Sequence, residues 1–332
     1  FIFDSRKEIM KSSLQNIKKP ILITGASGFI GSNLLRFFFC NNIEAFALVR
    51  KNSNLWRIKD FVNKKKLYSI NLEEKSKLKK IIKKIKPKTI FHLATYGGSS
   101  HQNEEKKIKS CIYDGTLNLI DVCSKYKFNL FVNTGSSSEY GFTDKPMEES
   151  DPLKPNSFYS LYKGMTSMYC KYLSQSKNLP IVTVRPFHVY GPYESNNRLI
   201  PNLINSLIKK KKIYLVDAQI SRDLLHVNDL INFYIKLTRL NIKKYIKGKI
   251  YNLGFGKRVT IRMIFNRIKV ITKSDFKPKW NSMKNRKWDQ KIWLANTNYV
   301  RKHLKWQPKI SYSKGLKMTY LWIINYYEKN NK

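Results

Sequence analysis

The first half of the chain alternates short apolar runs with longer segments whose apolar positions recur at helical spacing. Strands are predicted at residues 21–24, 45–49, 67–70, 89–94 and 130–134, and helices at residues 32–40, 73–86 and 107–125. Strands that alternate with helices indicate a parallel sheet with right-handed crossover connections. The pattern therefore predicts an α/β fold with a Rossmann-type, doubly wound parallel sheet.

A glycine-rich turn separates the first predicted strand from the first predicted helix. Gly25, Gly28 and Gly31 have the spacing G-x-x-G-x-x-G. In this context, the first glycine permits a tight turn, the second lets the backbone approach a pyrophosphate, and the third lets the helix pack closely on the strand. The sequence therefore predicts a dinucleotide-binding turn, formed by Gly25, Ser27, Gly28, Phe29, Ile30 and Gly31.

The end of the second predicted strand bears on which dinucleotide binds. NAD-binding folds of this type carry Asp or Glu here, which binds the ribose 2′-hydroxyl. In this chain Arg50 follows the strand. A cation does not repel a 2′-phosphate and can bind it, so Arg50 favours NADP, with NAD as the alternative.

The strand and helix alternation loosens beyond Gly191, which predicts a smaller C-terminal lobe. A helix is expected to open at residues 198–201, a strand to cover Ile213–Asp217, and a final helix with a polar tail to lie within residues 308–332. Asp229 is expected to cap a helix N-terminus. We expect three parts: an N-terminal extension (1–18), a dinucleotide-binding domain (19–190) and a mainly substrate-binding lobe interleaved with it (191–332).

The chain is strongly basic, with a formal net charge of +42. Such a charge is typical of proteins that bind nucleic acid or anionic membranes. However, only 13 of the 64 basic residues are Arg, and the lysines are spread along the whole chain. This distribution favours a compositional bias that places lysine at solvated positions, so a nucleic-acid partner is not expected.

Composition otherwise predicts a globular, cytoplasmic enzyme. Hydrophobic residues make up 42% of the 332 residues, and no apolar run reaches the ~18 residues that a membrane span needs. The opening lacks the layout of a signal peptide. Cysteines are not spaced as metal ligands, so we expect reduced thiols and no metal site: Cys40, Cys111, Cys123 and Cys170.

Tyr159 and Lys163 are four residues apart in a segment predicted to be helical to about Ser174, which places both on one helix face. An adjacent ammonium stabilises the phenolate form of a tyrosine and so promotes proton exchange. The same spacing recurs at Tyr245 and Lys249, where no other motif surrounds it. The pair acquires meaning only from the motifs around it.

Those motifs resemble the extended short-chain dehydrogenase/reductase superfamily, specifically its branch of nucleotide-sugar epimerases, dehydratases and reductases. The resemblance runs from about residue 19 to about residue 316. It rests on the glycine turn, His92-Leu93-Ala94, residues 114–119, the Tyr159/Lys163 pair, and residues 185–192 and 222–229.

The resemblance implies roles for residues along the predicted sheet edge. Tyr159 would be the general acid/base, Lys163 would bind the nicotinamide ribose, and Ser136, four residues before Tyr140, would hydrogen-bond the reacting oxygen. Further implied cofactor contacts are Asn71, Leu72, Leu93, Ala94, Thr134, Pro186 and His188. Implied substrate contacts are Arg222, which would bind a diphosphate, and Ser137, His188, Arg198 and Arg286.

The chain departs from the dehydratases of this branch, which carry acidic residues in the two positions after the serine or threonine. Here these positions are Ser137 and Ser138, and Glu139 comes one place late. On a strand or extended loop, that shift would point Glu139 the other way. Dehydration is therefore disfavoured. Two reactions remain: reduction of a 4-keto(-6-deoxy) nucleotide sugar by NADPH, which Arg50 favours, and 4-epimerisation with retained NAD.

Two further expectations concern partners. By analogy with the branch, the enzyme would be a homodimer that acts on a nucleotide sugar and does not bind membranes. The alternative from another class is a nucleic-acid-binding or regulatory protein that keeps the dinucleotide fold, which the charge favours. The presence of Ser136, Tyr159 and Lys163 together argues against that alternative, because a pure binding protein needs none of the three.

Overall fold

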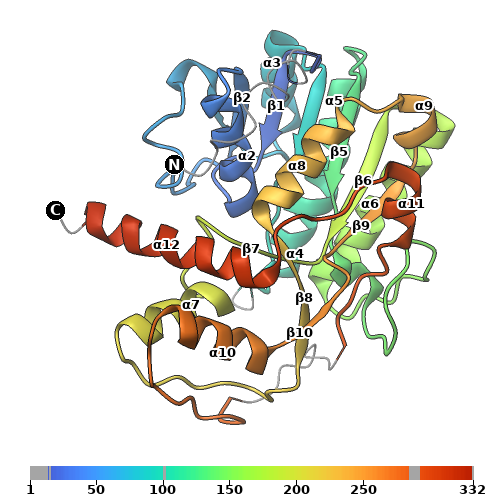
Figure 1. Cartoon of the computed structure of the whole chain (residues 1–332). Coiled ribbons are helices and arrows are strands. Elements are labelled where there is room, and N and C mark those ends of the chain that lie inside the picture. The colour runs from blue at the N-terminus through green and yellow to red at the C-terminus, as the bar shows by residue number, and fades with distance from the viewer. Residues whose placement is uncertain (1–13, 15, 100–101, 284–291, 331–332) are drawn as a thin grey trace. The chain divides into compact units, whose positions relative to one another are not determined.

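The computed structural model describes residues 14, 16–99, 102–283 and 292–330 (Figure 1). The chain forms two compact units, each assembled from three stretches. The first unit comprises Phe1–Gly135, Ser157–Val184 and Ile231–Ile250, and the second comprises Ser136–Asn156, Arg185–Leu230 and Tyr251–Lys332. The functional division at residue 190 stays a prediction.

A seven-stranded sheet organises the fold. Its order is β3-β2-β1-β4-β5-β6-β9, and the paired strands from β3 to β6 run parallel. This order confirms the predicted Rossmann-type α/β fold, in which the order reverses between β1 and β4. The strands are β1 (Ile21–Thr24), β2 (Ala45–Val49), β3 (Leu67–Ser69), β4 (Thr89–His92), β5 (Leu130–Thr134), β6 (Ile181–Pro186) and β9 (Ile250–Leu253).

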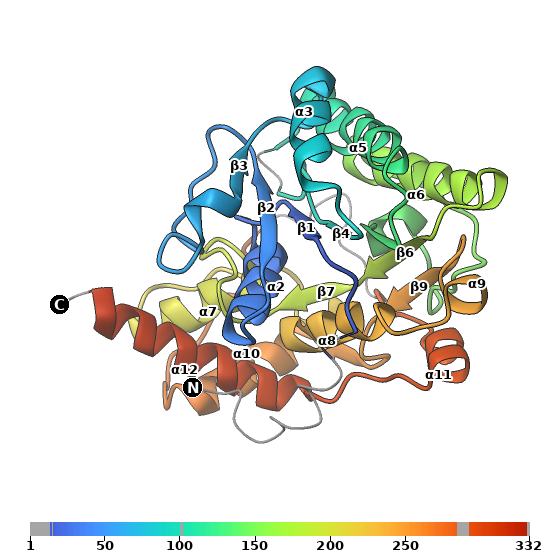
Figure 2. The ribbon, with the colours of Figure 1, turned by 90° about the horizontal axis from the view of Figure 1, so that it is seen from above.

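Helices of the first unit cover both faces of this sheet. Figure 2 shows α3, α5 and α6 along one face and α2 along the other. These helices are α2 (Phe29–Cys40), α3 (Lys75–Ile85), α4 (Glu105–Lys109), α5 (Gly115–Ser124), α6 (Phe158–Ser176) and the short α9 (Ile242–Tyr245). Between α4 and α5, the predicted helix contains a π-helical turn, Ser110–Asp114, so the segment is not a regular α-helix.

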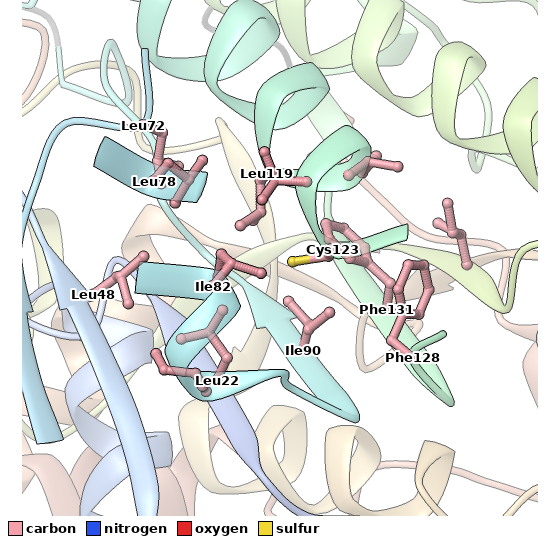
Figure 3. Close-up of a cluster of buried hydrophobic side chains, with 14 of the residues drawn as sticks. Leu22, Leu48, Leu72, Leu78, Ile82, Ile90, Leu119, Cys123, Phe128 and Phe131 are labelled. Atoms are coloured by element: carbon pink, nitrogen blue, oxygen red, sulfur yellow. The ribbon is translucent and has the colours of Figure 1, made fainter. Parts of the chain in front are cut away.

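The core of the first unit lies between the sheet and the helices α3 and α5 (Figure 3). Leu22 and Ile90 point from the strands towards Leu78 and Ile82 of α3, and all four are completely buried. In α3, the buried positions Leu78, Ile82 and Ile85 recur at spacings of four and three, while lysines occupy most of the remaining positions. Burial of each such side chain stabilises the fold by about 1.5–3 kcal/mol.

The second unit contains a three-stranded sheet with the order β10-β8-β7. Helices α7, α10 and α12 pack around a shared apolar core that includes Ile204, Ile264 and Leu316. Its elements are β7 (His188–Tyr190), α7 (Leu199–Ile208), β8 (Ser221–His226), β10 (Arg258–Thr260), α10 (Ile261–Ile271), α11 (Asn298–Leu304) and α12 (Tyr312–Asn330); helix α8 (Val227–Leu237) begins in this unit and ends in the first.

Two local expectations were wrong. Ile213–Asp217 forms no regular strand: its pairing is an isolated bridge between Tyr214 and Lys279, and the further backbone hydrogen bond from Ser282 to Leu215 does not extend this bridge into a ladder. Asp229 is not a cap: it lies in the first turn of α8, and its carboxylate accepts the backbone N–H groups of Lys309 (3.1 Å) and Ile310 (2.9 Å). It therefore anchors the segment that leads into α12.

None of the helices in the described parts of the chain is long and apolar enough to cross a membrane.

Candidate active site

The glycine turn follows β1 and leads into α2 in the first unit. Gly25 has a φ of +66°, and a Cβ atom there would lie 2.7 Å from the backbone of Leu93 and Ala94. A Cβ atom on Gly31 would lie 2.3 Å from the carbonyl oxygen of Gly25. Only glycine fits either position. The N-terminus of α2, a ready site for a phosphate group, follows directly at Phe29.

The other predicted cofactor residues of this unit lie at the carboxyl ends of neighbouring strands. Arg50 follows β2, is exposed, and has its guanidinium carbon 5.5 Å from the ring centre of Tyr96. After β3, the Leu72 carbonyl accepts a hydrogen bond from Asn118 (3.2 Å). Asn71 lies two residues after β3, Leu93 and Ala94 follow β4, and Thr134 ends β5. The sheet thus brings these residues to one edge.

Tyr159 and Lys163 lie in the first turns of α6. Ser157 caps this helix, since its side chain accepts the backbone N–H of Ser160. Lys163 is only 5% exposed, and its Nζ donates to the carbonyl oxygen of Thr134 (2.7 Å). The same Nζ lies 6.0 Å from the ring centre of Tyr159. A buried ammonium, fixed by the end of β5, therefore stands beside the phenol ring.

Ser136 begins the second unit, immediately after β5 and Gly135. It caps a 3₁₀ turn, Ser137–Tyr140, where the sequence suggested a strand or extended loop. Its backbone N–H donates to Glu139 Oε1 (2.7 Å), and its hydroxyl is 2.6 Å from that of Ser138. The Ser137 hydroxyl accepts a hydrogen bond from Trp293 Nε1 (2.9 Å). The expectation of an extended segment was wrong, because the capping interactions close the chain into a turn.

Two cationic side chains of the second unit surround His188. Burial, Arg198 and Arg222 together lower the pKa of His188 to about 3, so the imidazole is neutral. Its Nε2 atom is buried and has no hydrogen-bond partner among the described residues. Arg222 Nη1 donates to the carbonyl oxygen of Ser221 (2.9 Å). Guanidinium groups of this kind suit bidentate binding of a diphosphate.

Two predicted site residues remain, Pro186 and Arg286. Pro186 ends β6 and is buried. Arg286 lies outside the described residues, so its predicted contact with the substrate stays a prediction.

The glycine turn and the α6 pair occur in the order and spacing of one known family. The model of the NAD dependent epimerase/dehydratase family matches residues 21–254. The chain belongs to this family. It is therefore an enzyme of the extended short-chain dehydrogenase/reductase type, as the sequence motifs implied.

Relatives in this family have different activities. The chain is 26% identical to a dTDP-D-glucose 4,6-dehydratase of Dictyostelium discoideum, over 71% of this chain and 58% of the relative. It is 24% identical to a dTDP-4-dehydro-6-deoxyglucose reductase of Escherichia coli, over 76% of this chain and 81% of the relative. The structure of a UDP-glucose 4-epimerase with UDP-glucose from Thermotoga maritima superimposes with a TM-score of 0.84 at 22% identity, covering 92% of this chain and 99% of that one.

Sequence reasoning missed two groups that shape the second unit of this family member. Glu139 and Arg185 form a fully buried ion pair, with 2.7 Å between Glu139 Oε2 and Arg185 Nε. Arg185 Nη1 also donates to the Tyr140 hydroxyl (2.8 Å). Both carboxylate oxygens of Glu139 are thus engaged, one by Ser136 and one by Arg185. The sequence offered one signal for this ion pair: Arg185 lies within the apolar strand before Pro186, where a charge needs a partner. The motif interpretation gave Arg185 no role of its own.

Glu194 is the second group. It is 4% exposed, and its Oε2 atom has no hydrogen-bond partner among the described residues. Arg198 Nε lies 3.9 Å from Glu194 Oε1 and is itself 45% exposed, too distant and too hydrated to compensate for burial. Burial therefore raises the pKa of Glu194 to about 8. The enzyme holds this carboxyl protonated at neutral pH.

Replacing Glu194 with Gln tests this burial. The pKa of Glu194 is about 8 in the folded enzyme against an ordinary 4.5, so wild-type stability falls as pH rises between these values. Gln cannot ionise. The free energy of unfolding of Glu194→Gln, relative to that of the wild type, should therefore increase by up to about 1.4 kcal/mol per pH unit as the pH rises across this range. Urea unfolding at several pH values measures the difference. A difference in unfolding free energy between Glu194→Gln and the wild type that does not change with pH would contradict the assignment.

Proposed function

We propose that this enzyme reduces a 4-keto(-6-deoxy) nucleotide sugar. NADPH, held by the glycine turn and Arg50, would supply the hydride that reduces the carbonyl carbon. Tyr159 donates its phenolic proton to the carbonyl oxygen, Ser136 donates a hydrogen bond to that oxygen, and Lys163 stabilises the phenolate that remains. The observation that carries this proposal is the fixed position of the Lys163 ammonium, which Thr134 holds 6.0 Å from the centre of the Tyr159 ring.

The turn after β5 supports reduction or epimerisation over dehydration. A dehydratase needs a carboxylate that can remove a proton next to the carbonyl carbon. In the Ser136–Tyr140 turn, Glu139 is the sole carboxylate, and both its oxygens are bound to Ser136 and Arg185. Breaking a buried ion pair of this kind costs about 3–5 kcal/mol. Glu139 therefore acts as a structural group.

The choice between reductase and epimerase follows from the cofactor. The glycine turn fits a dinucleotide, since its backbone approaches other backbone more closely than any side chain would allow. Arg50, exposed at the end of β2, supports NADP. A reductase consumes the reduced form, NADPH, and must exchange the cofactor at each turnover. The family description, NAD dependent, supports the alternative: 4-epimerisation with a retained NAD. Relatives of both kinds occur.

Turnover and one substitution test the proposal. Purified enzyme should oxidise NADPH, measured by its absorbance, when supplied with a 4-keto-6-deoxy nucleotide sugar. Tyr159→Phe should lower kcat by about 10²–10⁴-fold, because the proton donor is lost while the ring remains. Tyr245→Phe, in the second Y-x-x-x-K match, is the control and should keep full activity. No NADPH oxidation together with interconversion of UDP-sugar epimers would favour the epimerase.

A second substitution tests the cofactor assignment. Arg50→Ala should raise the KM for NADPH by roughly 10-fold or more, because a charge-assisted hydrogen bond to the 2′-phosphate is lost. The KM for NADH should change by less than about 2-fold. The neighbouring Lys51→Ala removes an exposed cation of the same charge and should leave both values unchanged. Equal effects of Arg50→Ala on the two cofactors would argue for NAD.

The high positive charge supports an alternative of another class, a nucleic-acid-binding protein, which experiment can test. Lysines cover the exposed surface of α3, which is the kind of surface that binds nucleic acid weakly and without specificity. RNA binding that is tight at low salt and steeply salt-dependent, in a protein where Tyr159→Phe changes no activity, would favour a nucleic-acid-binding protein on this fold.

We also propose a cytoplasmic homodimer. All four cysteines are free thiols, which suits a reducing compartment. Helix α6 carries an apolar stripe at alternating spacings of three and four residues, the pattern of a helix that packs against another helix. It consists of Phe158 (45% exposed), Leu161 (37%), Met165 (37%), Met168 (63%) and Tyr172 (63%). A second copy of this chain would cover the stripe with the same residues.

Placing a charge in the centre of this stripe tests the dimer. Met168→Lys should convert the dimer to monomer, because a buried, unpaired ammonium opposes association. Light scattering coupled to size-exclusion chromatography measures the mass. Leu321→Lys, at a 42% exposed apolar position of α12, should leave the mass unchanged. A wild type that is monomeric at micromolar concentration would refute the proposal.

A further inference from the structure

A chain of hydrogen bonds runs through the first unit beneath the glycine turn. It starts at Thr24, the last residue of β1, crosses to His92 at the end of β4, and reaches Thr116 in the first turn of α5. Thr24 Oγ1 is 2.7 Å from His92 Nδ1, and His92 Nε2 is 2.8 Å from Thr116 Oγ1. All three side chains are at most 3% exposed. His92 belongs to the His92-Leu93-Ala94 motif, for which the resemblance to the superfamily implies no role of the imidazole.

The donors and acceptors permit only one direction along this chain. A threonine hydroxyl has one hydrogen and two lone pairs. Thr24 Oγ1 accepts the backbone N–H groups of Leu93 and Ala94, each at 3.2 Å, which uses both lone pairs. It must therefore donate its own hydrogen to His92 Nδ1. A neutral imidazole that accepts at Nδ1 carries its proton at Nε2, and that proton is donated to Thr116.

The far end of the chain reaches the helix that carries the predicted catalytic pair. Thr116 donates its hydroxyl hydrogen to the carbonyl oxygen of Ile112, in the π-helical turn. The hydroxyl of Thr166 in α6 lies 3.4 Å from the same carbonyl and donates mainly to the Tyr162 carbonyl (2.7 Å), so the last step is a weak contact with α6. Burial and the Lys163 ammonium lower the pKa of His92 to about 3, which keeps the imidazole neutral in the physiological range.

We infer that Thr24, His92 and Thr116 are positioning residues for the dinucleotide, because they hold the Leu93–Ala94 loop against the glycine turn. Thr24 ties both loop N–H groups to β1, and this is the same loop that Gly25 approaches so closely that no side chain fits. The Thr24 hydroxyl thus adds to the backbone pairing of β1 with β4 in holding the two halves of the predicted cofactor site together. This inference rests on the proposed dinucleotide cofactor; none of the three side chains needs to touch it.

Nuclear magnetic resonance tests the direction of the chain without any ligand. In protein with ¹⁵N-labelled histidine, long-range ¹H–¹⁵N spectra distinguish the two neutral tautomers of each of the five histidines. His92 should be protonated at Nε2 only, and unchanged between about pH 5 and pH 9. A proton on Nδ1, or titration near the ordinary pKa of about 6.5, would overturn the inference.

Direct titration of NADPH and NAD, followed by fluorescence or calorimetry, tests the positioning role. Thr24→Val removes the side-chain acceptor of the Leu93 and Ala94 N–H groups and leaves Leu93 only the Thr24 carbonyl at 3.3 Å, so it should raise Kd by roughly 10-fold or more. Thr24→Ser keeps the hydroxyl and should restore binding. Thr116→Val, which removes only the far end, should have a smaller effect. Thr89→Val is the matched control: Thr89 lies on β4, the strand that ends at His92, is 1% exposed, and donates to the Lys18 carbonyl (2.7 Å) at the opposite end of that strand.

The outcomes separate positioning from a purely structural role. Thr89→Val should lower the thermal midpoint and leave Kd unchanged. If Thr24→Val and Thr116→Val do likewise, the chain only stabilises the fold and the inference fails. Should Thr24→Val not fold, Thr116→Val and the tautomer of wild-type His92 decide. A wild type that binds neither dinucleotide would refute the proposed function and the positioning role together, whereas the tautomer measurement would still establish the hydrogen-bond direction.

Discussion

The close approach of two backbone segments at the carboxyl ends of β1 and β4 is the constraint on which the first unit depends. Gly25 lies so near the peptide between Leu93 and Ala94 that a single added carbon would be 2.7 Å from it. Thr24, one residue earlier, binds the N–H groups of the same peptides. The sheet order reverses at these two strands, which is where doubly wound sheets bind ligands. Removing side-chain volume here leaves room for a dinucleotide and lets the turn remain rigid.

Buried ionisable groups in the two units differ in how the loss of their hydration is compensated. Lys163 loses nearly all its hydration and regains one strong hydrogen bond, which its Nζ donates to the Thr134 carbonyl oxygen. In the second unit, Glu139 and Arg185 neutralise one another at 2.7 Å, whereas Glu194 has a cation only at 3.9 Å and takes up a proton. The difference follows from geometry, because Coulomb attraction offsets desolvation only in close, well-bonded pairs.

Much of the fold and part of the site follow from local sequence. Strand β2 has the predicted bounds, and the seven-stranded parallel sheet confirms the alternation of strands and helices. The predicted strand at Ile213–Asp217 was wrong because an apolar run can be buried without a partner strand, and no local pattern indicates whether a partner is present. The buried ion pair of Glu139 was not predicted because its partner, Arg185, is 46 residues away in sequence. Residue roles at the site, including those of Ser136, Tyr159 and Lys163, stay predictions.

By itself, the sequence determined the features that short-range geometry controls. Three such features can be recognised within a few residues, because turns and helices repeat over that distance: the glycine spacing after a strand, a four-residue interval on a helix, and serine rather than an acid in the two positions after Ser136. Tertiary structure alone decided which polar groups are paired. Lys163 meets Thr134, Glu139 meets Arg185, and His92 joins Thr24 to Thr116 across 68 and 24 residues of chain. Hydrogen bonds and ion pairs act over a few ångströms in space, and only folding sets which residues come that close.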